Sequence, residues 1–323
     1  MAGVASRRAF PVADGIVGLD LMFQGKPGGI GAFALVGPGG RFVLVESGPE
    51  STYEGLLAAL SEAGLEPARL EAVLLTHIHL DHAGAAGRLA RQTGCAVYVH
   101  PVGLPHLADP SRLWASASRV FGDAMERLWK AITPVPQDRL RPLEDGVRLA
   151  FVGRDVEAYH TPGHASHHVV FRVDGSLLFA GDLAGVRLPQ LPYVRVPAMP
   201  PELEVETWIA SLRRARELRP RQLVLTHFGS VTEGVEEHLA AVERQLRRWS
   251  ETVLDGMRDG LDDAGLLRRL QALEAREMGG GPAADEARAT LELVTPLGQV
   301  LQGYRRYWTR HHPERLTTSS PRP

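Results

Sequence analysis

The sequence predicts a layered α/β domain followed by a helical extension. Through the first two thirds of the chain, short apolar runs broken by glycine and proline alternate with amphipathic stretches. This order is typical of sheets covered by helices. After about residue 230 the pattern is helical throughout. We therefore expect an α/β domain over residues 1–230 and a helical extension over residues 231–323.

The predicted strands are short apolar runs that end in turn residues. They cover residues 15–23, 29–37, 41–48, 70–75, 95–100, 147–151, 155–160, 167–173 and 176–182, and residues 221–230 are predicted as a last strand followed by a loop. The run LEAVLL, residues 70–75, is apolar on both faces and too short for a helix, so it predicts a buried strand. Helical spacing predicts helices over residues 51–65, 83–94 and 202–220, and a helical insert near 105–132.

The extension contains an apolar stripe whose members are spaced alternately by four and three residues, the pattern of a helix packed along another helix. The stripe consists of Val235, Leu239, Val242, Leu246, Trp249 and Val253. Packing within the same chain and a homodimer seam both agree with it. The stretch MGGGPAADE, residues 278–286, predicts a flexible loop, and TTSSPRP at 317–323 predicts a disordered end.

Composition and charge exclude some classes of partner. The 323 residues carry a formal net charge of -2 and are 44% hydrophobic, so nothing directs the chain toward nucleic acid or an acidic membrane. Cys95 is the single cysteine, which excludes an intramolecular disulfide and is typical of a reducing compartment. The first residues contain no apolar segment of signal-peptide length. We expect a cytoplasmic protein that acts on a small molecule.

One stretch, THIHLDHAG over residues 76–84, concentrates metal-ligand side chains. It places His77, His79, Asp81 and His82 directly after the predicted buried strand. Imidazoles and carboxylates bind zinc, manganese and iron. Side chains two apart in an extended segment point the same way, and a turn into a helix can aim the next pair at a second metal. The stretch therefore predicts ligands for two neighbouring ions.

One segment cannot supply every ligand of two metals, and three later apolar runs end in further candidates. These are His160, His164, His167 and His168 in VEAYHTPGHASHH, Asp182 at the end of LLFAGD, and His227 in LVLTHFG. In layered α/β proteins, functional residues gather where strands end in loops. An aspartate that follows an apolar strand and a glycine suits a carboxylate shared by two metals.

These motifs resemble those of the metallo-β-lactamase-fold hydrolase superfamily, and within it the glyoxalase II-like and lactonase-like branches. The resemblance rests on THIHLDHAG, TPGHASHH, FAGD and LTHFG and covers roughly residues 12–230. It implies a four-layer αββα sandwich. It also implies one metal bound by His77, His79 and His164. A second metal would be bound by Asp81, His82 and His227, with Asp182 bridging the two ions.

The implied ligand set predicts a hydrolase that holds two divalent ions per chain. Zinc is favoured, and manganese or iron would also fit. Two cations lower the pKa of a shared water toward neutrality and so supply a bridging hydroxide that attacks a carbonyl. Asp182 holds the ions together, and Asp81 takes part in proton transfer because it lies beside the nucleophile. The expected substrate is a small ester, thioester or lactone.

Side chains next to the ligands are expected to orient them through hydrogen bonds. His168, four residues after His164, is one candidate. The others are three threonines beside ligands or motifs, Thr76, Thr161 and Thr226, for which ordinary strand preference is the alternative. The remaining histidines of this region, His160 and His167, are interpreted as structural or exposed.

Substrate selection is expected from loops around the site. The insert carries Arg112, Trp114 and Trp129 and is a candidate lid. The segment that follows the bridging aspartate, residues 185–197, carries Arg187, Tyr193 and Arg195. An arginine there would suit a carboxylate or phosphate of the substrate, and arginines on a solvated loop are the alternative.

Three other functions stay open on the residues alone. The same metals would serve a phosphodiesterase that acts on small phosphorylated or nucleotide substrates. A persulfide dioxygenase of this fold uses one iron, and a second set of ligands would be redundant there. A non-enzymatic metal-binding interaction protein is the third, and seven intact ligands argue against a disused site.

Overall fold

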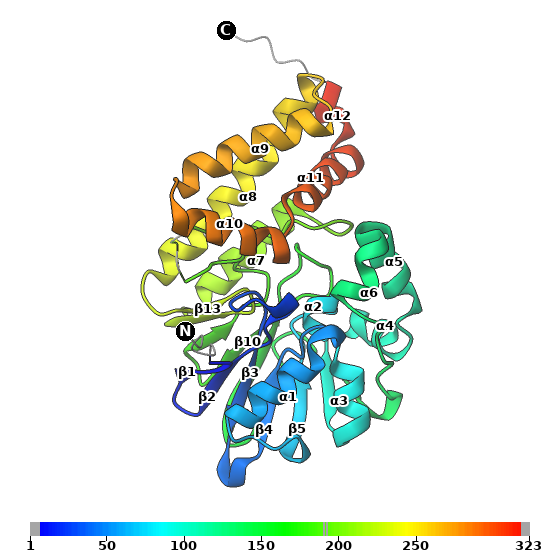
Figure 1. Ribbon diagram of the computed structural model, residues 1–323, viewed down its shortest axis with the longest axis vertical. Helices are drawn as coiled ribbons and strands as arrows, with labels where there is room; N and C mark the ends of the chain where they lie inside the picture. Colours follow the sequence, from blue (N-terminus) through cyan, green and yellow to red (C-terminus); the bar gives the residue numbers. More distant parts are fainter. Residues whose placement is uncertain (1–6, 190, 192, 318–323) are drawn as a thin grey trace, which may run out of the picture.

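The computed structural model describes residues 7–189, 191 and 193–317. Two mixed sheets lie face to face, and helices cover the outer face of each sheet (Figure 1). The layers run helix, sheet, sheet, helix, which confirms the predicted αββα sandwich. Beyond Thr317, the predicted disordered end lies outside the described residues.

The first sheet follows chain order. Its strands are β1 (Ala9–Ala13), β2 (Ile16–Asp20), β3 (Gly31–Val36), β4 (Phe42–Val45), β5 (Leu70–Leu74), β6 (Ala96–Val99) and β7 (Leu140–Pro142). Pairs are antiparallel from β1 to β4 and parallel from β4 to β7. Strand β5 has a parallel neighbour on each side, and all of its residues except Glu71 are buried. This confirms the buried strand predicted before the histidine motif.

The second sheet has the spatial order β13-β12-β11-β10-β9-β8. Its strands are β8 (Arg148–Phe151), β9 (Arg154–His160), β10 (Val169–Val173), β11 (Leu177–Phe179), β12 (Gln222–Leu225) and β13 (Gly229–Val231). All pairs are antiparallel except β11 with β12. That parallel pair is joined through a crossover helix, α7 (Val205–Glu217), as parallel neighbours require.

Alternation along the strands builds the layers. In β3, Phe33 and Leu35 belong to the core between the two sheets, whereas Ala34 faces the helices outside the first sheet. In β12, Val224 faces the same intersheet core and Leu225 faces outward. Because side chains of a strand point alternately to its two faces, strands with apolar residues on both faces end up buried between layers.

Helices cover both outer faces. On the first sheet lie α1 (Tyr53–Glu62) and α3 (Ala86–Thr93), and α2 (Leu80–Ala83) precedes α3. On the second sheet lie α7 and α8 (Val235–Arg258). The insert forms α4 (Leu104–Ala108), α5 (Ser111–Phe121) and α6 (Met125–Leu128). Single-turn 3₁₀ helices fill the connections Phe23–Gly25, Pro38–Gly40, Glu50–Thr52, Pro67–Arg69, Pro101–Gly103, Gly122–Ala124 and Gln137–Arg139.

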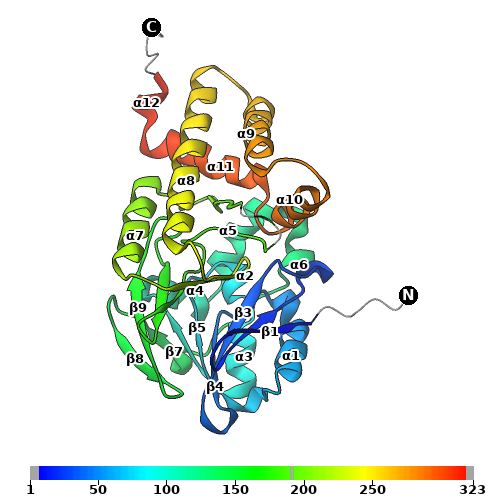
Figure 2. The same cartoon turned by 90° about the vertical axis from the view of Figure 1, so that its left-hand side faces the viewer.

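The helical extension stacks on one end of the sandwich (Figure 2). After α8 it comprises α9 (Asp263–Met278), α10 (Pro282–Val294), α11 (Leu297–His311) and α12 (Pro313–Thr317). The stripe on α8 shares one hydrophobic core with the second sheet and α11: Leu246 and Trp249 are buried together with Leu223 and Tyr304. This confirms the interpretation that the stripe packs within its own chain. A homodimer stays a prediction, and it would need another surface.

Two local predictions were wrong or incomplete. Residues 282–286, taken as loop, begin α10. Proline is favoured in the first helical turn, because the backbone N–H that it lacks would have no partner within the helix there. Strands β1, β7 and β13 were not predicted. All three are edge strands, and two contain a proline, Pro11 and Pro142, which a sheet tolerates at its edge.

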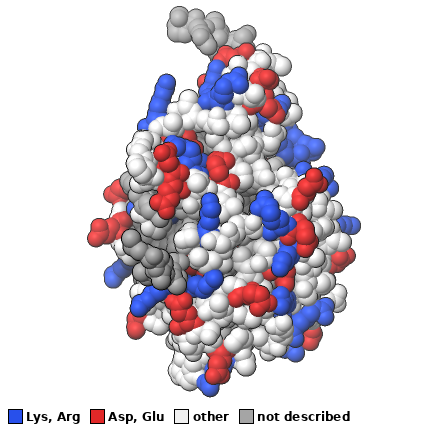
Figure 3. Space-filling model, in the orientation of Figure 1, with Lys and Arg blue, Asp and Glu red and all other residues white. Residues whose placement is uncertain are grey.

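The surface charges and the hydropathy of the helices agree with the expectation drawn from composition, which gave no indication of a nucleic-acid or membrane partner. Basic and acidic side chains are interspersed over the face shown in Figure 3. Among the described residues, no helix combines the length and the apolar character needed to cross a membrane.

Close docking of α11 predicts a steric effect at Gly303. A Cβ at Gly303 would lie 1.8 Å from the carbonyl oxygen of Ala198, whereas one at Gly298 of the same helix would meet nothing within 4 Å. We predict that Gly303→Ala lowers the free energy of unfolding by about 1–3 kcal/mol through overpacking. Gly298→Ala should raise it or leave it within about 1 kcal/mol. Denaturant titration measures both, and equal effects would contradict the docking.

Candidate metal centre

The seven predicted ligands meet at one edge of the sandwich, and each lies shortly after a strand, in a turn or a short helix. His77, His79, Asp81 and His82 follow β5, His164 follows β9, Asp182 follows β11 and His227 follows β12. His79 is the residue immediately before α2, and Asp81 and His82 are on that helix. The sheet ends therefore gather side chains that are up to 150 positions apart in the chain, which is the difference between 227 and 77.

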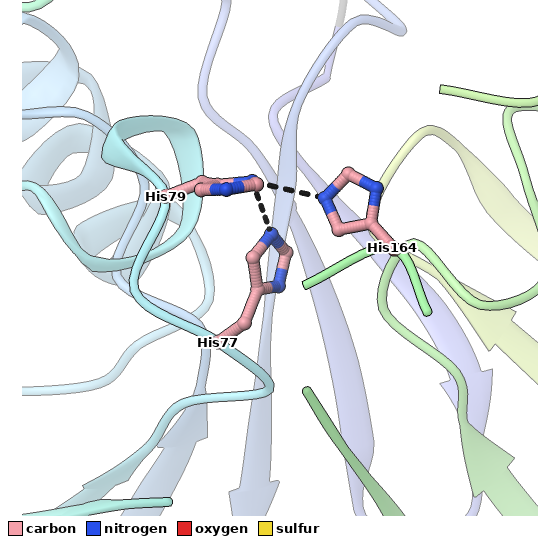
Figure 4. Close-up of side chains that lie close together, drawn as sticks. All are labelled: His77, His79 and His164. Atoms are coloured by element: carbon pink, nitrogen blue, oxygen red, sulfur yellow. Dashed lines mark hydrogen bonds between the residues drawn. The ribbon is translucent and has the colours of Figure 1, made fainter. Parts of the chain in front are cut away.

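Three imidazoles converge in the first cluster (Figure 4). Nδ1 of His79 lies 3.1 Å from Nε2 of His77 and 2.9 Å from Nε2 of His164. Nitrogen ligands placed about 2.0–2.1 Å from a tetrahedral zinc lie roughly 3.3 Å apart, so this spacing suits three ligands of one ion. All three rings could hold one metal ion together.

Hydrogen bonds on the far side of two rings assign their tautomers. Nδ1 of His164 lies 2.9 Å from the carbonyl oxygen of Pro197, so it must donate. Nδ1 of His77 lies 3.0 Å from Oγ1 of Thr76, whose own hydroxyl donates to Glu46 at 2.5 Å. Each ring therefore carries its proton on Nδ1 and presents the Nε2 lone pair to the cluster.

Burial keeps these rings neutral. It lowers the pKa of His164 to about 4. Burial and the neighbouring imidazoles of His82 and His79 hold the pKa of His77 well below its ordinary value. Neutral imidazoles are the form that binds a metal, so the first cluster needs no deprotonation at pH 7.

The second cluster combines Asp81, His82 and His227, which could also hold a metal ion. Oδ2 of Asp81 lies 3.3 Å from Nε2 of His227 and 3.6 Å from Nε2 of His82. Nδ1 of His227 donates to the carbonyl oxygen of Gly29 at 2.9 Å, which leaves its Nε2 facing the carboxylate. Nδ1 of His82 lies 3.0 Å from Oε1 of Glu46.

Asp182 lies between the two clusters, and its oxygens face different ones. Oδ2 lies 3.3 Å from Nε2 of His164, whereas Oδ1 lies 3.2 Å from Nε2 of His82 and 3.5 Å from Nε2 of His227. Oδ1 of Asp182 and Nε2 of His82 are buried, yet neither forms a hydrogen bond with acceptable geometry. Burying a polar atom without a hydrogen-bond partner lowers the stability of the fold. A cation between the Asp182 oxygen and the His82 nitrogen would give both atoms a partner. The donor set therefore fits divalent metal binding.

Charges in the second cluster are strongly coupled. Burial would raise the pKa of Asp81, but His82 and His227 hold it down at about 2. Burial would likewise lower the pKa of His82, but the carboxylates of Asp81, Asp182 and Glu46 keep it well above its ordinary value. The carboxylates thus favour positive charge at this position, which a bound cation would supply.

Comparison with known proteins agrees with this geometry. The model of the metallo-beta-lactamase superfamily matches residues 27–227. The chain belongs to the metallo-beta-lactamase superfamily. The match ends where α8 and the rest of the helical extension have not yet begun, so the extension lies outside the family model.

Two superfamily proteins resemble the chain in sequence or in structure. The metallo-beta-lactamase fold-containing protein ST1585 of Sulfurisphaera tokodaii is 31% identical over 175 residues, which are 53% of this chain and 66% of that protein. Its crystal structure superposes with a TM-score of 0.61 at 23% identity and covers 86% of this chain and 93% of that chain. The metallo-beta-lactamase family protein TTHA1429 of Thermus thermophilus gives a TM-score of 0.61 at 22% identity, over 87% and 89%.

The sequence relatives include a protein named as a hydrolase. The hydroxyacylglutathione hydrolase of Xanthomonas euvesicatoria pv. vesicatoria is 31% identical over 150 residues, which are 46% of this chain and 44% of that enzyme. The chain thus matches less than two thirds of the length of either ST1585 or this hydrolase.

Glu46 is a residue of the site that sequence reasoning missed. It is fully buried at the end of β4, and its carboxylate accepts hydrogen bonds from the hydroxyls of Thr76 and Thr226. It also faces Nδ1 of His82 and so helps to orient ligands of both clusters. An acidic residue shortly after an apolar strand, the signal that identified Asp182, also marks Glu46.

The predicted orienting role of His168 has a clear geometry. Its Nε2 accepts a hydrogen bond from the backbone N–H of Asp182 at 3.1 Å, so its Nδ1 carries the proton and donates to Oγ1 of Thr161 at 2.9 Å. Gly181 lies between these groups with φ of 48°. A Cβ there would lie 2.7 Å from both His168 Nε2 and Thr76 Oγ1, so only glycine fits.

A pocket opens onto both clusters. Its floor contains His79, Asp81, His164 and Asp182, and its walls come from α5, from residues 197–202 and from the end of α10. The insert thus borders the site as expected, through Arg112 and Trp129. Of the two alternatives given for His167, exposure is excluded, because this side chain is buried and lines the pocket.

His160 keeps the structural role expected of it, with Nε2 lying 2.7 Å from the carbonyl oxygen of Leu143.

The predicted substrate contacts from the other loop residues were wrong. Arg195 is fully buried, where it forms a two-point ion pair with Glu274 at 2.7 and 2.8 Å and a further pair with Glu292 at 2.8 Å. The hydroxyl of Tyr193 also donates to Glu274. Both side chains attach the loop to the helical extension.

Two further candidates lie outside the described pocket lining. Arg187 makes backbone hydrogen bonds with His227 and Phe228. Trp114 packs at the margin of the core beneath the first sheet.

Crowding at Gly181 gives a test of ligand positioning. We predict that Gly181→Ala lowers metal affinity about 10- to 100-fold, because the methyl group displaces the segment that carries Asp182. Gly122→Ala is the control, since Gly122 has a similar φ of 52° and nothing within 4 Å of the added atom. Like Gly181 it has a positive φ, and its variant should keep wild-type metal affinity. Competition with a chromogenic chelator measures both, and equal losses would contradict the crowding.

The buried ion pair predicts that Arg195 stabilises the fold. Arg195→Met should lower the free energy of unfolding by about 3–5 kcal/mol, because it leaves Glu274 buried without its partner. Arg248→Met removes an arginine that is 57% exposed from its pair with Glu277, and should cost at most about 1 kcal/mol. Denaturant titration compares the two. A raised KM without loss of stability would instead restore the substrate role.

Proposed function

We propose that this chain is a dinuclear metal-dependent hydrolase that cleaves a small ester, thioester or lactone. The observation that carries the proposal is the division of the Asp182 carboxylate between two ligand clusters. His77, His79 and His164 would hold one ion, and Asp81, His82 and His227 the other. Zinc is the metal we favour for this set of imidazoles and carboxylates. Cys95 is free and buried, which suits the proposed cytoplasmic location.

Divalent ions bound here would lower the pKa of a coordinated water and polarise the substrate carbonyl. Water adds to the carbonyl carbon, the bond to the leaving oxygen or sulfur breaks, and the products are a carboxylate, an alcohol or thiol, and a proton. Asp81, whose side chain is 18% exposed and lies on the pocket floor, is the carboxylate placed to take that proton.

Buried groups around the ligands fix the orientation of the ligand side chains. Glu46 and Thr76 fix the ring of His77, and the Pro197 carbonyl fixes the ring of His164. His168 fixes the backbone of Asp182. Because each support is buried, the ligands keep their orientation without relying on solvent.

Thioester cleavage has support from one relative. The hydroxyacylglutathione hydrolase named above acts, as its name states, on a hydroxyacylglutathione, and its match covers 46% of this chain. We keep ester, thioester and lactone together as acyl substrates, since the same attack on a carbonyl serves all three.

The dinuclear proposal is tested by metal content and turnover of one variant. Wild-type protein should contain about two metal ions per chain and hydrolyse p-nitrophenyl acetate. Asp182→Ala should lose at least one ion and lower turnover at least about 100-fold, because the shared carboxylate is gone. Asp138→Ala, at a residue whose side chain is 75% exposed, should change neither quantity.

Three results would contradict the proposal. Unchanged turnover in Asp182→Ala would remove the role of the shared carboxylate. One iron per chain together with oxygen consumption on a persulfide would favour the dioxygenase. Cleavage of bis(p-nitrophenyl) phosphate, with no cleavage of any ester, would favour the phosphodiesterase.

A further inference from the structure

The pocket above the ligand clusters has an apolar face supplied by α5. Leu113, Ala117 and Val120 line it, spaced by four and three residues, so they form one side of the helix. Phe121 and Trp129 close the same wall, with ring centroids 5.0 Å apart. These residues offer a substrate dispersion contacts and few hydrogen bonds.

A second part of the pocket wall is also apolar and depends on the helical extension. It contains Met199 and Pro200, together with Val294 at the end of α10. The chain just before Met199 is tied to the extension: the backbone N–H of Val196 donates to Gln245 of α8 at 2.6 Å. The extension thus contributes the side chain of Val294 to the pocket directly. It also positions Met199 and Pro200 by holding the loop that carries them.

The rim of the pocket is apolar as well. Val102 lines it and is 48% exposed, which makes it the one large hydrophobic side chain classed as exposed among the described residues. Val102 thus adds an apolar side chain to a cleft whose walls are already apolar, as is common in ligand-binding clefts. The charged wall residues Arg112 and Glu202 have opposite signs, so they give no net preference for substrate charge.

We propose that this pocket binds the aliphatic acyl group of the ester or thioester, and that Ala117 and Val294 help to set the acyl length that fits. The inference rests on the proposed function, since the carbonyl must lie at the ligand clusters on the pocket floor. It adds that the extension, which lies outside the family model, takes part in substrate selection.

Chain-length dependence tests the pocket. With p-nitrophenyl acetate, butyrate and octanoate, wild-type kcat/KM should rise at least about tenfold from acetate to octanoate, because each buried methylene contributes up to about fourfold. Ala117→Trp and Val294→Trp should lower the octanoate-to-acetate ratio at least about tenfold by filling the pocket. Ala115→Trp on α5 and Ala289→Trp on α10 are the controls, since both alanines are exposed and neither lines the pocket.

A binding measurement separates this inference from the proposed function. Calorimetry on the metal-loaded wild-type chain should show octanoate binding at least about tenfold more tightly than acetate. Tighter octanoate binding without hydrolysis of any ester would support the pocket and overturn the proposed function. Hydrolysis with equal kcat/KM for all three esters and equal binding of both acids would overturn the pocket alone. Ratios that fall equally in the control variants would overturn the assignment to Ala117 and Val294.

Discussion

The structure depends on one electrostatic constraint, the concentration of imidazole nitrogens and carboxylate oxygens at a buried sheet edge. Asp182 Oδ1 and His82 Nε2 lie 3.2 Å apart without a hydrogen bond, and neither is exposed to water. Such an arrangement is unfavourable unless positive charge lies among the donors. The fold imposes it all the same, because strand ends, a glycine with no room for a Cβ and buried hydrogen bonds hold every ligand in place. We therefore infer that the fold holds these side chains in an arrangement suited to metal binding.

The ligands were predictable because each one follows a local pattern. An apolar run followed within about three residues by a histidine or an acid identifies a strand that ends at the functional edge, and this held for His77, Asp182 and His227. The same pattern marked Glu46, which was overlooked because a lone acid at a strand end also suits a solvated turn. The sandwich itself was predicted through a family resemblance, and the alternation of apolar residues explains it physically.

Sequence patterns could not identify interactions between residues that lie far apart in the chain. Arg195 resembles a loop arginine free to meet a substrate, but its partners Glu274 and Glu292 lie 79 and 97 residues further on. Its burial comes from the helical extension, whose docking no local pattern encodes. The extension proves to be continuous with the core of the second sheet, and it contributes to the pocket wall. Local patterns thus identify the ligand residues, whereas the pocket depends on long-range packing.

The central claim is that two ions share Asp182, and X-ray absorption at the metal edge tests it most directly. On the metal-loaded wild-type protein, the account predicts a first shell of mixed nitrogen and oxygen ligands and a metal–metal distance of about 3.5–4 Å. Asp182→Ala should lose the metal–metal signal. A first shell that fits one isolated ion, with no metal–metal signal at full loading, would contradict the account.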